Sequence, residues 1–75
     1  MKNTGVVTTK LGHYIRCQRL RRGWSFTECG HAFGVDKATV WRLENSGTSP
    51  RMATIQRIAK AFRVKPSSVV KIMMS

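Results

Sequence analysis

The sequence has very few acidic residues. Only three of its 75 residues are Asp or Glu, against fourteen Lys and Arg, and the formal net charge at pH 7 is +11. Solubility alone does not require such an imbalance, because a surface of mixed charges is equally well solvated. The excess positive charge therefore suggests a polyanionic partner, either a nucleic acid or an anionic membrane surface.

Long apolar runs are also missing. No stretch approaches the roughly 20 apolar residues that span a bilayer, and residues 1–10 lack the apolar core of a signal peptide. We therefore expect a cytoplasmic protein with reduced thiols and no membrane partner.

Residues that bind metals or catalyse reactions are sparse. Cys17 and Cys29 cannot build a disulfide framework, and the nearby His13 and His31 do not give a zinc-finger spacing. The sequence shows no Ser/His/Asp set, paired carboxylate or glycine-rich phosphate loop. We expect a protein that is not an enzyme, with two cysteines as small apolar fillers and with no metal, cofactor or small-molecule ligand.

Strand-like alternation is absent as well, and apolar residues recur at helical spacing. The chain is long enough for one small domain, residues 1–75, with an N-terminal tail at 1–8. Glycines, prolines and capping residues divide the remainder into five predicted helices, at about 9–22, 25–33, 37–44, 50–62 with Ser49 as its cap, and from Pro66 onward.

The second and third predicted helices lie very close together in the chain. Ser25 and Glu28 have the spacing of a capping box, and Asp36 is a good N-cap for the third helix. Only Gly34-Val35-Asp36 separates the two helices, which is typical of a helix-turn-helix. Gly30 costs its helix about 1 kcal/mol relative to alanine, so we expect another helix to approach closely there.

The third helix has two unlike faces. Residues three and four apart share a face, so Val40 and Leu43 lie together and predict the buried side. The predicted opposite face carries Lys37, Ala38, Trp41, Arg42 and Asn45.

That opposite face suits a DNA major groove. Lys37 or Arg42 could donate to O6 and N7 of guanine, and Ala38 and Trp41 could contact thymine methyl groups or sugars. The alternative is that Trp41 packs on a neighbouring helix or at a dimer contact, as most large aromatic side chains do.

Residues 11–64 resemble the Cro/repressor-type helix-turn-helix domain of phage and bacterial regulators. The matching positions are Leu11, Gly12, Ile15, Arg16, Arg19, Gly23, Trp24, Ser25, Glu28, Gly34, Val35, Val40, Arg42, Leu43, Glu44, Pro50, Ile58, Ala59, Lys60, Ala61, Phe62 and Val64. The resemblance implies an all-α, compact five-helix domain that binds operator DNA, usually as a two-fold dimer, with the third helix in the major groove.

The resemblance also implies roles for individual residues. It assigns base and adjacent phosphate contacts to Lys37, Ala38, Thr39, Trp41 and Arg42. It assigns backbone contacts to Ser25 and Phe26 at the start of the second helix, and to Asn45, Ser46 and Thr48 in the following loop. It implies an ion pair between Arg19 and Glu44 that joins the first and third helices. Phe26 stands where the family usually has glutamine, which removes a donor to DNA, and it could instead brace Trp41.

These features together predict a dimeric transcriptional regulator of Cro/repressor type that binds a palindromic double-stranded operator. Repression is favoured over activation because Glu28 is the only acid on the second helix. The small size suits a phage or plasmid regulator. The alternative is a protein-binding module, such as an antitoxin or controller protein, in which DNA binding is secondary. RNA binding is disfavoured because the aromatics do not lie on a sheet platform.

Overall fold

Five helices and no strand make up the part of the chain that the structure, a computed structural model, describes, namely residues 9–47 and 49–75. The predicted all-α fold class is thereby confirmed. The helices are α1 (Lys10–Arg21), α2 (Phe26–Phe33), α3 (Lys37–Asn45), α4 (Met52–Phe62) and α5 (Pro66–Met74). The predicted tail at residues 1–8 lies outside the described residues.

Most helix ends lie where the capping residues predict them. The Thr9 hydroxyl oxygen accepts a hydrogen bond from the Gly12 backbone N–H at 2.9 Å and so caps α1. Gly34 ends α2 in the left-handed conformation, with φ of 74°, which glycine adopts without steric cost.

The predicted start of α4 is wrong. Its N-cap is Arg51, which makes no side-chain capping hydrogen bond, and the predicted cap Ser49 lies two residues earlier. Ser49 and Pro50 line the hollows beside α1 and α3. The backbone is still extended at Arg51, with φ of −75° and ψ of 163°, so α4 begins only at Met52.

Phe62, near the end of α4, organises the aromatic part of the core. Its ring packs edge-on against Tyr14 and Phe33, with centroid distances of 5.7 and 5.4 Å, and stacks with Trp24 at 6.3 Å. The buried apolar residues are Leu11, Ile15, Cys29, Phe33, Val40, Leu43, Ile55, Ile58, Ala59, Phe62 and Val69. Each of the five helices contributes to this one core.

Two glycines allow close backbone approaches. A Cβ atom on Gly12 would lie 2.8 Å from the carbonyl oxygens of Leu43 and Glu44, so α1 and α3 cross with their backbones in contact. A Cβ on Gly30 would lie 2.7 Å from the Val35 carbonyl oxygen. The expected helix approach at Gly30 is therefore wrong, because the element that requires a glycine there is the turn between α2 and α3.

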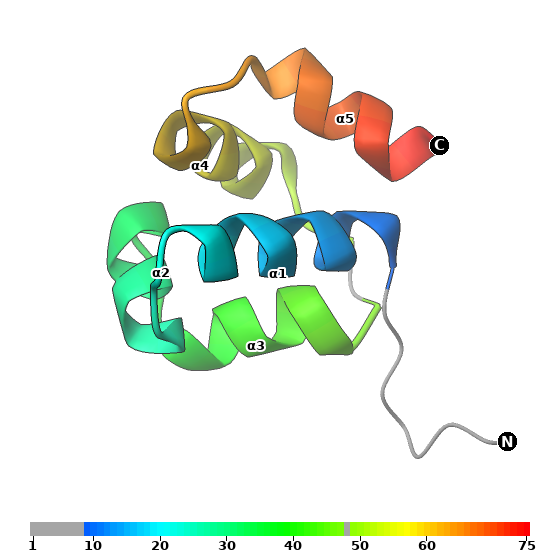
Figure 1. The fold of residues 1–75 in the computed structure, drawn as a ribbon. Coiled ribbons are helices and arrows are strands. Elements are labelled where there is room, and N and C mark those ends of the chain that lie inside the picture. The colour runs from blue at the N-terminus through cyan, green and yellow to red at the C-terminus, as the bar shows by residue number, and fades with distance from the viewer. Residues whose placement is uncertain (1–8, 48) are drawn as a thin grey trace, which may run out of the picture.

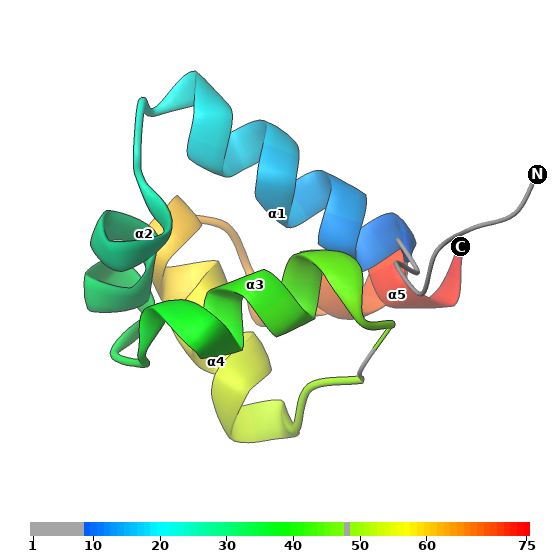
Figure 2. The same cartoon turned by 90° about the horizontal axis from the view of Figure 1, so that it is seen from below.

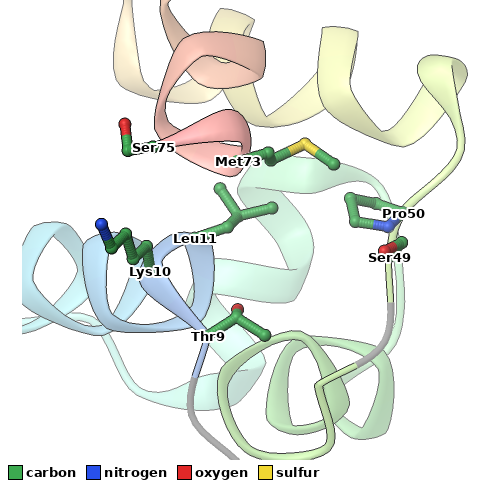
Figure 3. A pocket seen from close by; sticks show the side chains of 7 residues that line it. All are labelled: Thr9, Lys10, Leu11, Ser49, Pro50, Met73 and Ser75. Atoms are coloured by element: carbon green, nitrogen blue, oxygen red, sulfur yellow. The ribbon is translucent and has the colours of Figure 1, made fainter.

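The arrangement of the helices leaves one side of α3 open. α1 runs across the middle of Figure 1, with α3 below it and α4 and α5 above. Figure 2 looks onto α3 from below, and no other labelled helix crosses in front of it. At the N-terminal end of α1, Leu11 and Met73 of α5 line a hollow of about 220 Å³, together with Pro50 (Figure 3).

Candidate nucleic-acid interface

The start of α3 is fixed by Asp36. Its carboxylate accepts hydrogen bonds from the Thr39 backbone N–H, at 2.9 Å, and from the Thr39 hydroxyl. These two bonds hold the pKa of Asp36 below its ordinary value of 3.8, and the bond from the Thr39 hydroxyl has the larger effect. The predicted cap is therefore present, and it holds the first turn of α3 directly after the turn that follows α2.

The inner face of α3 carries a buried charge. Glu44 has no exposed surface, and its carboxylate oxygens accept hydrogen bonds from Arg19 Nε at 2.7 Å and Nη2 at 3.2 Å. Arg19 Nη1 also donates to the Trp24 carbonyl oxygen at 3.1 Å. The hydrogen bond to Glu44 raises the pKa of Arg19 above its ordinary value, although burial acts in the opposite direction. The ion pair that the resemblance implies thus joins α1 to α3.

Arg16 belongs to the same network, which sequence reasoning did not predict. Its Nε lies 3.3 Å from Glu44 Oε1, and its Nη2 donates to Asn45 Oδ1 at 2.6 Å. Arg16 and Arg19 are three residues apart on α1 and so share a helix face. That spacing is the sequence signal that could have identified Arg16.

Asn45 does not lie on the open face of α3, and that prediction is wrong. Only 8% of the residue is exposed, and its amide Nδ2 donates to the Trp41 carbonyl oxygen at 3.1 Å while its Oδ1 binds Arg16. The side of α1 that carries Arg16 covers this flank of α3. Both ends of the amide are therefore occupied within the protein.

The remaining predicted face is open to solvent. Lys37, Ala38, Trp41 and Arg42 are all exposed, and Trp41 retains 45% of its accessible surface. Thr39 is half-buried at the edge, where its hydroxyl is engaged by Asp36. The prediction that Trp41 and Arg42 are not sealed beneath the rest of the monomer agrees with this geometry.

The start of α2 presents a hydroxyl and an aromatic ring. Ser25 is exposed and forms the predicted capping box, in which its hydroxyl accepts from Glu28 N at 3.0 Å and its own N–H donates to Glu28 Oε1 at 2.8 Å. The guanidinium carbon of Arg19 lies 4.2 Å from the Phe26 ring centroid. Phe26 therefore supports the buried arginine, and the expectation that it braces Trp41 stays a prediction.

The segment after α3 carries two predicted backbone contacts and one residue that sequence reasoning missed. The exposed Ser46 hydroxyl donates to the Arg42 carbonyl oxygen at 2.7 Å, while Thr48 lies outside the described residues. A hollow of about 270 Å³ separates α3 from the start of α4, and Thr39, Arg42, Leu43, Ser49, Pro50, Arg51 and Thr54 line it. Arg51 was missed because α4 was predicted to begin before it.

The cysteines and histidines do not form a reactive or metal-binding centre. Burial, helped by the nearby charge of Glu44, raises the pKa of Cys29 to about 11, so this thiol stays protonated at neutral pH. Cys17 Sγ lies 3.5 Å from His13 Nε2 on α1. Within residues 9–47 and 49–75, no three His, Cys, Asp or Glu side chains gather closely enough to hold a metal ion.

The arrangement of α2, the short turn and α3 defines the class of the protein. Residues 10–69 match the helix-turn-helix domain family, and the chain belongs to this family. Within it, the chain is of the Cro/repressor-like kind that the sequence resembles.

Two regulators are similar to the chain. It is 36% identical to the HTH-type transcriptional regulator SutR of Escherichia coli strain K12 over 52 aligned residues. These residues make up 29% of SutR and 69% of the chain. It also superimposes on an HTH_3 family transcriptional regulator from Vibrio cholerae with a TM-score of 0.71 and 25% identity, covering 84% of the chain and 35% of that protein. The chain thus spans about a third of the length of these relatives.

Among the described residues, none of the five helices has the length and the apolar composition that a membrane-crossing helix needs.

Proposed function

We propose that the chain is a sequence-specific, double-stranded DNA-binding regulator of transcription that places α3 in the major groove. The observation that carries the proposal is the open face of α3, on which a large aromatic side chain and exposed cations remain uncovered. A tryptophan that keeps 45% of its surface exposed beside cations suits a partner with a negative backbone and apolar base edges.

Arg42 and Lys37 are the proposed donors to bases. Both are exposed on α3, and a guanidinium can donate two parallel hydrogen bonds to O6 and N7 of guanine. Ala38 and Trp41 supply apolar surface for thymine methyl groups or sugars. Asn45 is left out of this set because its amide is engaged by Arg16 and Trp41.

The proposed backbone contacts flank this face. Ser25 and Phe26 at the start of α2, Thr39 on α3, and Ser46 and Thr48 after it are the predicted phosphate or sugar contacts. The exposed Arg51 adds a cation on the other side of α3, across the hollow that Arg42 also lines. Contacts of this kind fix the orientation of the protein, whereas the base contacts give sequence specificity.

We further propose that the protein acts as a homodimer on a palindromic operator and represses transcription by excluding polymerase in the cytoplasm. The end of α5 is the proposed dimer contact. Val69 is fully buried in the monomer, but Val70, Ile72 and Met73 are half-buried and Met74 is 80% exposed. Repression fits the position of Glu28, whose carboxylate is engaged in the capping box of α2.

A protein-binding module in which DNA binding is secondary is the competing function, as in an antitoxin or a controller protein. A salt titration of binding to duplexes chosen from a random pool separates the two. A dimer that makes about 6–10 phosphate contacts should lose roughly 10³–10⁵ in affinity between about 50 and 200 mM salt. Arg21→Ala, at the exposed end of α1, is the matched control for charge alone.

The selected duplexes also test stoichiometry and specificity. A dimeric regulator should enrich two symmetric half-sites and bind them with two protomers per duplex. Weak binding that is equal for all sequences would contradict the proposal and favour the protein-binding module.

A further inference from the structure

A second basic surface lies away from α3. The end of α2 and the outer side of α4 enclose a hollow of about 740 Å³, the largest of the three hollows described here. Its lining is His31, Ala32, Phe33, Gly34, Ala53, Gln56, Arg57, Lys60, Ala61 and Arg63. We call it the α2–α4 groove. Neither α3 nor the segment between α3 and α4 contributes a residue to it, so it is not part of the proposed DNA-binding face.

The charge of the α2–α4 groove is not neutralised from within. Arg57, Lys60 and Arg63 line it together with His31, and no carboxylate does. The chain has only three acids, and each is used elsewhere. Glu28 closes the capping box of α2, Asp36 caps α3, and Glu44 is buried beneath the arginines of α1.

Arg57 is held in place by the end of α2. Its Nη1 lies 3.4 Å from the Phe33 carbonyl oxygen and 3.3 Å from that of Gly34. These carbonyls carry the partial negative charge of the helix C-terminus, so the guanidinium is fixed at the mouth of the groove. Arg57 therefore has a structural role that a binding experiment must leave intact.

Arg63 occupies a backbone position that favours glycine. It ends α4 with φ of 59° and ψ of 43°, and among the described residues it is the only one other than glycine with positive φ. A left-handed conformation costs a side-chain-bearing residue about 1 kcal/mol or more, and helices commonly end there with glycine. The arginine at this position keeps a cation at the edge of the groove despite that cost.

We propose that the α2–α4 groove binds an acidic, amphipathic segment of a second protein. The cations that line it fit carboxylates, and Ala32, Ala53 and Ala61 of the same lining offer apolar surface to the apolar face of a helical segment. A DNA duplex presents phosphates along its backbone and would leave the apolar side chains of the groove without a contact. The partner is thus a regulator of the chain that can bind while α3 is free or on DNA, and this inference goes beyond the proposed function.

The experiment uses a short fluorescent peptide of Glu, Leu and Ala in helical repeat, with a Lys-for-Glu version as the charge control. Arg63→Gly is the decisive variant, since it removes both the cation and the cost of the positive φ at this position. We expect it to bind the acidic peptide about five-fold or more weakly, while its unfolding midpoint in urea stays the same or rises. Lys60→Ala should also weaken binding of the acidic peptide. Arg63→Lys keeps a cation at this position, so it should retain most of the parent chain's affinity for the peptide.

Arg21→Ala removes one charge from α1 and leaves the groove unchanged, so it should bind the peptide like the parent chain. Equal weakening by Arg21→Ala and Arg63→Gly would overturn the proposal in favour of general charge attraction. Absence of peptide binding to the parent chain, or equal binding of the Lys version, would also overturn it.

A second arm adds a bound duplex. The proposal expects the peptide to bind the protein–DNA complex as tightly as the free protein, and expects Arg42→Ala to leave peptide binding unchanged. Displacement of the peptide by the duplex would place the peptide on the DNA-binding face instead. If Arg63→Gly loses affinity for the duplex and the peptide equally, the groove binds nucleic acid and the proposal is overturned. The peptide arm requires no DNA, so its failure is distinct from failure of the proposed function.

Discussion

The two flanks of α3 treat polar and apolar side chains in opposite ways. On the flank toward α1, Glu44 is fully buried and Asn45 nearly so, and each polar group meets an arginine from α1. On the outer flank, Trp41 is left 45% exposed next to the exposed Arg42. Hydropathy alone would predict the reverse, because carboxylates are rarely buried and tryptophans rarely exposed.

The inner flank fixes the position of α3, whereas the outer flank is the surface that we propose for a DNA partner. The buried carboxylate accepts bonds from two arginines, so it fixes the position of α3 on α1. The outer side chains make no comparable contribution to the fold. Substitutions on the two flanks should therefore separate stability from binding.

Glu44→Ala should have the largest effect. It leaves Arg19 buried without its counter-ion, which typically costs about 3–5 kcal/mol, a large part of the about 5–15 kcal/mol that stabilises a small domain. Urea unfolding followed by circular dichroism measures this loss. A loss below about 1 kcal/mol would show that the buried pair does not hold α3 in place.

Gly12→Ala tests the backbone contact between α1 and α3. The added Cβ would lie 2.8 Å from two carbonyl oxygens, so the helices must separate, and overpacking of this kind costs about 1–3 kcal/mol. Gly23→Ala is the control, because its Cβ meets nothing within 4 Å and only the cost of φ at +68° remains. If Gly12→Ala unfolds at the same temperature as the parent chain or higher, the close crossing has no energetic weight.

Arg42→Ala tests the outer flank. We expect a loss of about 1–3 kcal/mol in operator binding, concentrated at one base pair per half-site, with the free energy of unfolding unchanged because the side chain is exposed. Binding to a panel of single-base operator variants measures both. Uniform weakening across the panel would assign Arg42 to a phosphate, and an unfolding change as large as that of Gly12→Ala would contradict the separation of the flanks.

The smallest expected effect concerns pH. The pKa of Asp36 is lower in the folded chain than its ordinary 3.8, so its ionised form stabilises the fold above that pH, and this contribution is lost as pH falls through the folded pKa. Asp36→Asn retains a good N-cap that does not titrate. The difference in unfolding midpoint between the two proteins should therefore shrink or change sign below about pH 4. A difference that is constant with pH would exclude this role of the carboxylate.

The sequence predicted the elements more reliably than their mutual positions. Local signals such as the Ser25–Glu28 capping box, the Asp36 cap and the glycine of the turn act within a few residues, and the structure contains all of them. The exposure of Trp41 followed from the helical spacing of Val40 and Leu43. The buried state of Asn45 did not, because it depends on which flank of α3 is covered by α1. The start of α4 depends on the path of the chain past α3, which capping propensities do not encode.

The open face of α3 also has a consequence for how this family can diversify. Since Lys37, Ala38, Trp41 and Arg42 are exposed, exchanging them should leave the melting temperature nearly unchanged. Variants with altered operator preference are then reachable through a series of single replacements, each of which still yields a folded protein.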